Sequence, residues 1–411
     1  MTTDPTRPVG VDVPDHVPEN LVWRHSIDEF TRELDDPYLA GARLHNGPDI
    51  IWAQNAVLGK PAWVLTRHAL IQEAYLAPDV FSSDRQNLAL LGVDWKLNPL
   101  EYDPPEHQAY RKILNPFFTP RAMAELDVSV REVCDTLIAK FADLGGCEFI
   151  SEFAEQFPSY IFLDFMGMPR DKLNDFLEWE RVMIQAADPM KKFTAMKSVL
   201  TYMETYVEEQ RNNPTTDLMK GLFSARMDNG SPLSEGEIMG MCYLLYIGGL
   251  DTVFSALGWI LRHLALDNPL QERLRANPQD IPQAVEELMR AYPVATTHRE
   301  VKRDIHFHGV DMRVGDWVLF PTFLAARDPR VYDNPHVVDI DRRARHITFA
   351  TGPHLCLGVH LARRELKTVV EAFLSRFKNI RIASGEHYSF HTGGVFGVDR
   401  LPLEWDAVSD S

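Results

Sequence analysis

A long apolar stretch interrupted by one acid is the feature that most constrains the fold of this chain. Residues 238–250 carry no charge, and after Asp251 a second uncharged run covers residues 252–261. Directly before the first run, Ser234 and Glu237 have the spacing of a capping box, which marks the start of a helix. We expect one helix of roughly thirty residues, about 45 Å long, ending near Leu266. A helix of this length would cross a whole domain and form its centre.

Composition excludes several other classes of protein. A membrane-spanning helix needs about twenty apolar residues in an unbroken series, whereas Asp251 lies at the centre of this one. The first forty residues lack the basic and apolar regions of a secretory signal. The formal charge of -17 argues against nucleic-acid binding. Four cysteines without a CxxC pair favour free thiols in a reducing compartment. These features predict a cytoplasmic protein without a membrane or nucleic-acid partner.

The rest of the chain predicts a mainly α fold with small β-sheets. We expect residues 1–45 to be largely irregular, with a short helix near residues 27–34. Strand-like runs follow at residues 50–53 and 62–65, and the stretch at 305–320 also has a strand pattern. Helical spacing dominates residues 120–266, and another helix is expected at 357–377. No linker is evident, so residues 1–411 are predicted to form a single domain.

The most informative segment is Phe-Ala-Thr-Gly-Pro-His-Leu-Cys-Leu-Gly, at residues 349–358. It resembles the cysteine-ligand loop of cytochromes P450, Phe-x-x-Gly-x-His-x-Cys-x-Gly, with every fixed position present. A cysteine just before a helix has its thiolate stabilised by backbone amides and by the helix dipole. The resemblance implies the P450 fold, with haem b buried between the central helix and this loop. It implies that Cys356 is the axial iron ligand and that Phe349, His354 and Gly358 contact the cofactor.

The five residues Gly-Gly-Leu-Asp-Thr at 248–252 interrupt the apolar helix. Each glycine costs about 1 kcal/mol in helix propensity, and the Thr252 hydroxyl can bond the carbonyl one turn earlier, which bends helices. Taken alone, the pentapeptide also suits a close contact between helices. It matches the oxygen-activation motif of the family, however. The match implies that Gly248 and Gly249 leave room for haem and O₂, while Asp251 and Thr252 deliver protons.

Two further motifs follow from the resemblance. Glu287 and Arg290 form the Glu-x-x-Arg pair that braces the core of the family's fold, and Arg342 in a later Asp-Ile-Asp-Arg segment is the expected third partner. Residues 103–111 resemble the family's Asp-Pro-Pro-x-His-x-x-x-Arg segment. Haem propionates need cationic or hydrogen-bonding partners. By resemblance, these partners are His107, Arg111, Arg299 and His354.

Within the family, the segments at residues 248–253, 307–310 and 401–405 look most similar to the camphor hydroxylase group of bacterial enzymes. That resemblance implies a monomer that receives electrons from NADH through a ferredoxin reductase and a [2Fe–2S] ferredoxin. Basic residues near the cysteine suit docking of an acidic ferredoxin; they are Arg111, Lys112, Arg342, Arg343, Arg345, Arg363, Arg364 and Lys367.

The positions matched to the substrate pocket are mainly apolar, which is typical of sites for small hydrophobic ligands. They are Trp95, Ile247, Val294, Ala295, Thr297 and Phe396. We therefore predict a haem-thiolate monooxygenase that hydroxylates a monoterpenoid or related terpenoid with O₂. Two alternatives stay open: a haem-thiolate enzyme with another reaction, such as a peroxygenase or a reductase, and a non-catalytic haem sensor. The intact Asp251–Thr252 pair favours the monooxygenase.

Overall fold

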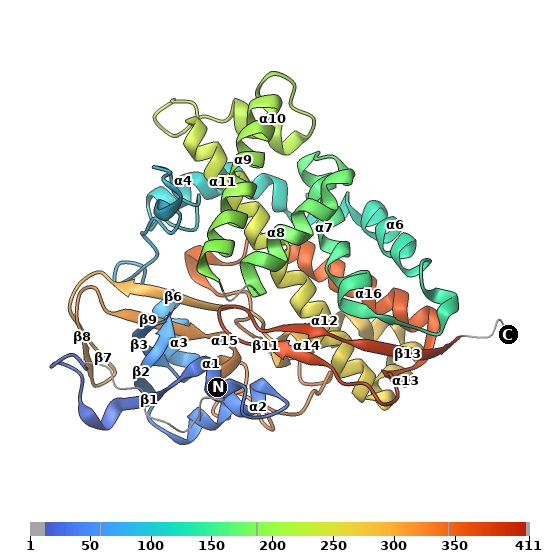
Figure 1. Cartoon of the computed structure of the whole chain (residues 1–411). Coiled ribbons are helices and arrows are strands. Elements are labelled where there is room, and N and C mark those ends of the chain that lie inside the picture. The colour runs from blue at the N-terminus through green and yellow to red at the C-terminus, as the bar shows by residue number, and fades with distance from the viewer. Residues whose placement is uncertain (1–12, 58, 186–187, 344, 408–411) are drawn as a thin grey trace. The chain divides into compact units, whose positions relative to one another are not determined.

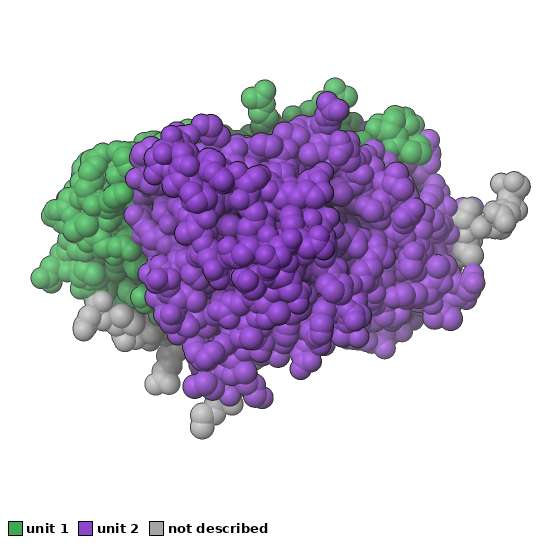
Figure 2. Space-filling view, turned by 90° about the horizontal axis from the view of Figure 1, so that it is seen from above, with its two compact units in different colours: residues 1–83, 277–356, 389–399 green, residues 84–276, 357–388, 400–411 purple. Residues whose placement is uncertain are grey.

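The structure is a computed structural model of the chain and describes residues 13–57, 59–185, 188–343 and 345–407 (Figure 1). Helices and a few small sheets make up the fold, as predicted. The chain divides into two compact units, each assembled from three separate stretches (Figure 2). Unit 1 comprises residues 1–83, 277–356 and 389–399, and unit 2 comprises the remainder. The single domain inferred from the sequence stays a prediction.

The apolar centre of the sequence forms two consecutive helices, α11 (Glu235–Gly249) and α12 (Asp251–Leu266). The capping box is confirmed: Ser234 Oγ accepts a hydrogen bond from the Glu237 amide at 3.2 Å, and Glu237 Oε2 accepts one from the Ser234 amide at 2.6 Å. The expected single helix is interrupted at Leu250, where ψ is -70°. Two glycines with poor helix propensity directly precede this residue, which accounts for the place of the break.

The two helices together are long and apolar enough to cross a membrane by length and composition alone. The most apolar window of Glu235–Leu266 has a mean hydropathy of 1.6, and 56% of that window is buried inside the molecule. The buried core helix of a globular protein satisfies the same length and composition criteria. Its burial agrees with the role of a core helix that the sequence predicts.

Unit 2 is mainly helical, and its α11 packs within a large apolar cluster that includes Met203, Tyr243 and Tyr246. A three-stranded antiparallel sheet, in the order β10-β13-β5, completes the unit. Its other elements are α4 (Glu106–Leu114), α5 (Pro120–Ala124), α6 (Asp127–Ile138), β5 (Gly146–Glu148), α7 (Gln156–Met166), α8 (Leu173–Gln185), α9 (Pro189–Asn212), α10 (Asp217–Ser224), α13 (Asn268–Ala276), α16 (Val359–Arg376), β10 (Phe377–Ile382) and β13 (Pro402–Ala407).

Unit 1 is built around a six-stranded sheet in the order β1-β2-β3-β9-β6-β4. The two strand-like runs predicted near its start pair as an antiparallel hairpin, β2 with β3, in which Ile50 lies opposite Leu65. Its elements are β1 (Val22–Ser26), α1 (Ile27–Thr31), α2 (Pro37–Ala42), β2 (Ile50–Val57), β3 (Lys60–Leu65), α3 (His68–Tyr75), β4 (Phe81–Ser82), α14 (Ile281–Ala291), β6 (Thr296–Val301), β7 (Ile305–Phe307), β8 (Val310–Met312), β9 (Trp317–Pro321), α15 (Thr322–Ala325), β11 (Ser389–His391) and β12 (Gly397–Arg400).

The N-terminal segment differs from the expectation of a largely irregular stretch over residues 1–45. Residues 1–12 lie outside the described part of the chain, but from Val22 the chain forms β1, α1 and α2. Strand β1 pairs in parallel with β2, so its strand conformation depends on a partner that is distant in sequence. Caps explain the two helices: the Ser26 hydroxyl accepts from the Glu29 amide, and the Asp36 carboxylate accepts from the Tyr38 and Leu39 amides.

Candidate active site

The residues predicted to form the site are divided between the two units, so each set is described within its own unit. Unit 1 contains Glu287, Arg290, Val294, Ala295, Thr297, Arg299, Arg342, Phe349, His354, Cys356 and Phe396. Unit 2 contains Trp95, His107, Arg111, Ile247, Gly248, Gly249, Asp251, Thr252 and Gly358.

The cysteine loop of unit 1 is closed by a backbone hydrogen bond between its ends. The Cys356 amide donates to the Phe349 carbonyl at 3.0 Å. Gly352 turns the loop with φ of +71°, and an added Cβ there would lie 3.0 Å from the Tyr75 carbonyl oxygen. A side chain at this position would be strained by the backbone angle and would collide with α3. The Thr348 hydroxyl donates to the Met289 carbonyl at 3.1 Å and fixes the loop to the end of α14.

Cys356 differs from the other three cysteines in its surroundings. Its residue is exposed, whereas Cys134 and Cys242 are fully buried and Cys147 is half-buried. Burial raises the pKa of Cys134 and of Cys242 to about 12, and it raises the pKa of Cys147 as well. Such thiols stay protonated and unreactive at neutral pH. Among the four cysteines, Cys356 is therefore the one whose surroundings leave its sulfur accessible to a ligand.

The break between α11 and α12 carries the predicted acid and alcohol. The Thr252 hydroxyl donates to the Gly248 carbonyl at 3.1 Å, the back-bond expected from the sequence. The Ser255 hydroxyl donates to Asp251 Oδ1 at 3.3 Å. A Cβ added at Gly248 would meet no atom within 4 Å, so this face of the helix is open. The helix thus presents bare backbone directly beside Asp251 and Thr252.

Helix α4 places the histidine and arginine of the Asp-Pro-Pro-x-His-x-x-x-Arg segment one turn apart, as their spacing predicts. His107 is 2% exposed, and Arg111 Nε donates to Asn115 Oδ1 at 3.0 Å. The helix is also fixed to the first turn of α11, because the Tyr110 hydroxyl donates to Glu237 Oε1 at 2.6 Å. Glu237, which belongs to the capping box of α11, therefore also orients the helix that carries His107.

Strand β6 directs Thr297 and Arg299 to the same side, since they are two residues apart. The Arg299 guanidinium lies 5.8 Å from the centre of the Tyr75 ring. The Tyr75 hydroxyl and Thr297 Oγ1 are 2.7 Å apart. Burial raises the pKa of Tyr75, so its hydroxyl remains a neutral hydrogen-bonding group. No sequence signal singled out Tyr75, because an apolar-facing tyrosine at a helix end is ordinarily a core residue.

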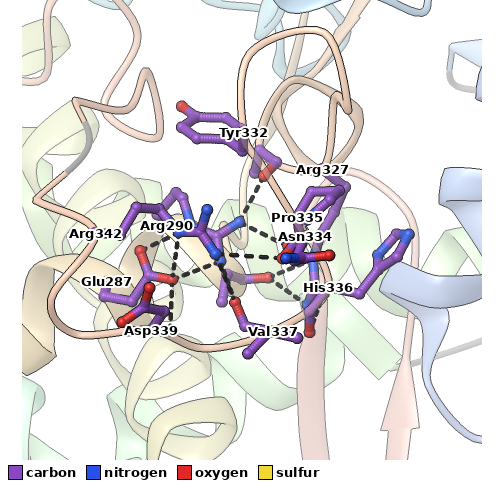
Figure 3. Close-up of polar contacts among 12 residues, drawn as sticks. Glu287, Arg290, Arg327, Tyr332, Asn334, Pro335, His336, Val337, Asp339 and Arg342 are labelled. Atoms are coloured by element: carbon purple, nitrogen blue, oxygen red, sulfur yellow. Dashed lines mark hydrogen bonds and ion pairs between the residues drawn. The ribbon is translucent and has the colours of Figure 1, made fainter.

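The predicted brace of unit 1 is formed by all three of its residues (Figure 3). Arg290 makes a bidentate ion pair with Glu287, at 2.9 Å from Nε and 2.7 Å from Nη2. Arg342 Nε donates to Glu287 Oε1 at 3.2 Å, and the Asp339 amide donates to the same oxygen at 3.0 Å. Arg290 also donates to the carbonyls of Ala326 and Pro335. Glu287 and Arg290 thereby hold the segment that precedes the cysteine loop against α14.

Because this network is buried, removing one charge should be costly. The side chain of Arg290 is 0% exposed and that of Glu287 is 4% exposed. We expect Arg290→Met to lower the free energy of unfolding by about 3–5 kcal/mol, because Glu287 loses its main partner inside the protein. The control is Arg330→Ala, which removes the exposed ion pair with Asp49 in the same unit and should cost less than about 1 kcal/mol. Urea unfolding measures the loss of stability in both variants. Equal losses would contradict the prediction that the buried brace contributes more to stability than the exposed ion pair.

For two of the residues assigned to the substrate pocket, Phe396 and Trp95, the structure shows the packing within their own units. Phe396 is 1% exposed and packs between Phe323 and Tyr38, with ring centroids 4.8 and 5.5 Å away. The chain is extended here, so the neighbouring Val395 points the opposite way, and it forms a bridge with Ala295. The assignment of Phe396 to the substrate pocket stays a prediction.

Trp95 contacts the start of the central helix. An added Cβ at Gly236, in the first turn of α11, would lie 3.0 Å from the Trp95 side chain, and the Trp95 ring centre is 6.1 Å from that of Tyr243. Ile247 belongs to the last turn of α11, where the helix face opens. The assignment of Trp95 to the pocket, made by counting back through a loop of variable length, stays a prediction.

Comparison with known proteins identifies the family. Residues 53–395 match the model of the cytochrome P450 family. The protein named Probable cytochrome P450 127A1, from Sinorhizobium fredii, is 34% identical over 404 residues, with 96% of this chain and 97% of that protein covered. The crystal structures of CYP101J2 and CYP101C1 are 30% and 28% identical, with TM-scores of 0.85 and 0.87, and each comparison covers 96% of this chain and 100% of the other. The chain belongs to the cytochrome P450 family, whose members are monooxygenases that use haem b and O₂.

The residues present fit a haem. A haem would be held by a cysteine thiolate in this family, and the exposed Cys356 is the residue that would supply it. In the part of the chain that the structure describes, no three His, Cys, Asp or Glu side chains come together to hold a bare metal ion. The open backbone at Gly248 suits the close approach of a flat ring. An exposed cysteine in one unit and an open helix face in the other are both compatible with a thiolate-ligated macrocycle.

Proposed function

We propose that this chain hydroxylates a small hydrophobic substrate, a monoterpenoid or related terpenoid, within the camphor hydroxylase group. The electrons come from NADH through a ferredoxin reductase and a [2Fe–2S] ferredoxin, and the protein is a cytoplasmic monomer. Cys356 ligates the haem iron. His107, Arg111, Arg299 and His354 bind its propionates.

The observation that carries the proposal is the acid–alcohol pair at the helix break. Thr252 is held by the Gly248 carbonyl at 3.1 Å, beside an open helix face, and Asp251 precedes it. When bound, the haem supplies O₂ activation by a thiolate-ligated iron. Such chemistry starting from O₂ consumes protons, which Asp251 and Thr252 deliver; a reaction starting from peroxide needs less proton delivery. The pair therefore favours an NADH-driven monooxygenase over a peroxygenase.

We infer the substrate class from the apolar character of the pocket candidates. Ile247, Val294 and Ala295 offer aliphatic surface, and Thr297 offers one hydroxyl, which Tyr75 already engages. The other two candidates, Trp95 and Phe396, are aromatic and add apolar surface. A pocket of this kind binds a compact hydrocarbon with few polar groups.

The ferredoxin-docking surface is smaller than the basic cluster in the sequence. Arg342 belongs to the buried brace with Glu287. Acids neutralise three other members: Arg364 pairs with Asp127 and Lys112 with Asp228, each at 2.6 Å, and Lys367 pairs with Glu371 at 3.5 Å. In unit 1, the exposed Arg343 and Arg345 supply positive charge that attracts an acidic partner.

A substrate panel tests the proposal. Monoterpenoids should displace the iron-bound water and shift the haem from low spin to high spin, and linear fatty acids of equal carbon number serve as controls. The terpenoid that gives the largest shift should be hydroxylated when NADH, reductase and ferredoxin are supplied. A spin shift with the fatty acids alone would contradict the substrate class. Product formation that requires hydrogen peroxide instead of NADH would contradict the electron supply.

A further inference from the structure

Helix α8 carries an acid that has no counter-charge, Glu180. The residue is 7% exposed, and its Oε1 is buried without a hydrogen-bond partner. Among the residues that the structure describes, none forms an ion pair with it. The adjacent Arg181 instead pairs with Glu155 at 2.9 Å. An ionised carboxylate in such a place is very costly, so Glu180 is expected to be a neutral carboxylic acid.

The packing of α8 brings this acid to the central helix. Phe176, one turn before Glu180, contacts Tyr246 of α11, with ring centroids 5.2 Å apart. The Tyr246 hydroxyl donates to the Phe176 carbonyl at 3.4 Å. The same turn of α8 is thereby fixed beside the last turns of α11, and Asp251 begins the next helix. Glu180 and Asp251 come from helices distant in sequence, and Asp251 is near enough for its charge to act on the Glu180 carboxyl group.

The electrostatics follow from this arrangement. Burial raises the pKa of Glu180 well above its ordinary value, and the negative charges of Asp251 and then of Glu155 raise it further. Two tyrosines face the same turn. Burial and the charge of Glu180 raise the pKa of Tyr246, and Tyr202 of α9 contacts Phe176 with ring centroids 5.1 Å apart. The negative charge of Asp251 therefore acts on the Glu180 carboxyl group and favours its protonated form.

We propose that Glu180 is a positioning residue that shares one proton with Asp251, so that the two carboxyl groups hold a single proton between them at neutral pH. The inference rests on the proposed role of Asp251 in proton delivery. The O–H bond of Glu180 breaks, its proton moves through water to the Asp251 carboxylate, and Asp251 then passes this same proton toward Thr252. Glu180, then anionic, takes up a proton from the solvent. Asp251 is thus recharged from inside the protein.

The proton itself can be observed in the reduced, CO-bound holoenzyme, which is diamagnetic. Glutamate labelled with ¹³C at the side-chain carboxyl gives one resonance that disappears in Glu180→Gln and so belongs to Glu180. This resonance should report a protonated acid at neutral pH. In Asp251→Asn its titration midpoint should fall by about one pH unit or more. The matched control, Glu155→Gln, should lower the midpoint less, because Asp251 acts more strongly on Glu180. A midpoint near 4.5, the ordinary value, or one that ignores Asp251→Asn, would overturn the proposal.

Unfolding offers a readout that does not depend on turnover. In the unfolded chain, Glu180 ionises at its ordinary pKa, whereas in the folded protein it ionises only at a raised pKa. The free energy of unfolding therefore decreases as the pH rises from the ordinary pKa to the raised one. Glu180→Gln should remove this part of the pH dependence, and an unchanged dependence counts against a neutral Glu180.

Kinetics separate this inference from the proposed function. Glu180→Gln should shift the pH profile of turnover and alter its solvent isotope effect, while the CO spectrum and the spin shift stay as in the parent. An unchanged pH profile would overturn the role of Glu180 alone. If Thr252→Ala and Asp251→Asn leave catalysis unaltered while the Glu180 midpoint still responds to Asp251→Asn, the shared proton stands and the proposed function fails.

Discussion

Replacing Cys356 by histidine is expected to abolish the strongly red-shifted Soret band of the reduced, CO-bound protein. The band arises from a thiolate that donates electron density to the iron. Of the four cysteines, Cys356 is the exposed one. The expected effect is complete: the thiolate-type band is lost and a histidine-type CO spectrum takes its place. Absorption difference spectroscopy of the reduced protein with and without CO measures it.

The matched control is Cys147→Ser. Cys147 lies in the short strand β5 of unit 2, and burial raises the pKa of its thiol, which makes it a poor ligand. The variant should keep the red-shifted band unchanged. A histidine-type spectrum in the parent protein, or a red-shifted band that survives Cys356→His, would contradict the assignment of the ligand.

Local sequence patterns predicted the parts of the structure that depend on near neighbours. The capping box of Ser234 and Glu237 forms as expected, and so does the back-bond from Thr252 to Gly248. The motif positions also placed Arg342 correctly: it contacts Glu287, although the two residues are 55 positions apart. Here the family resemblance supplied what local periodicity could not, because no helical or strand period connects the two segments.

Features that depend on tertiary packing were missed for physical reasons. The sequence did not predict that Phe396 packs against Phe323 and Tyr38, because an extended chain alternates its sides and a loop gives no register signal. Strand β1 pairs with β2 far along the chain, so its own sequence does not define it. Glu180 looks like an ordinary surface acid on an amphipathic helix, and only the packing of Phe176 on Tyr246 shows that it is buried. Whether an acidic side chain is buried depends on the helices that pack against its own helix.

Thr252→Ala should uncouple NADH consumption from product formation. The Thr252 hydroxyl is held at the helix break by the Gly248 carbonyl at 3.1 Å, beside the open helix face. Its proposed role in proton delivery comes after substrate binding and after transfer of the first electron. The spin shift and the haem content of the variant should therefore stay close to those of the parent. Without the hydroxyl, protons are misdirected and oxygen leaves as hydrogen peroxide. Coupling should fall several-fold while NADH consumption continues, as the ratio of product to NADH will measure.

Thr205→Ala is the matched control, because Thr205 makes the same type of bond to the carbonyl of Thr201, at 3.2 Å, on the exposed side of α9. It should leave coupling unchanged. Equal coupling in Thr252→Ala and the parent would mean that Thr252 is only a helix residue.

Asp251→Asn should give a different signature, because it keeps the shape of the side chain but removes its ionisable proton. Asparagine can still accept the hydrogen bond that Ser255 donates to Asp251 at 3.3 Å, so the helix start should persist. The whole cycle should slow by about 10²-fold or more, the usual contribution of a positioned acid or base. Proton transfer then becomes limiting, and the solvent isotope effect on turnover should change. A variant that is uncoupled at normal speed would instead assign to Asp251 the role proposed for Thr252, so the pair of measurements distinguishes the relay from the hydroxyl that directs it.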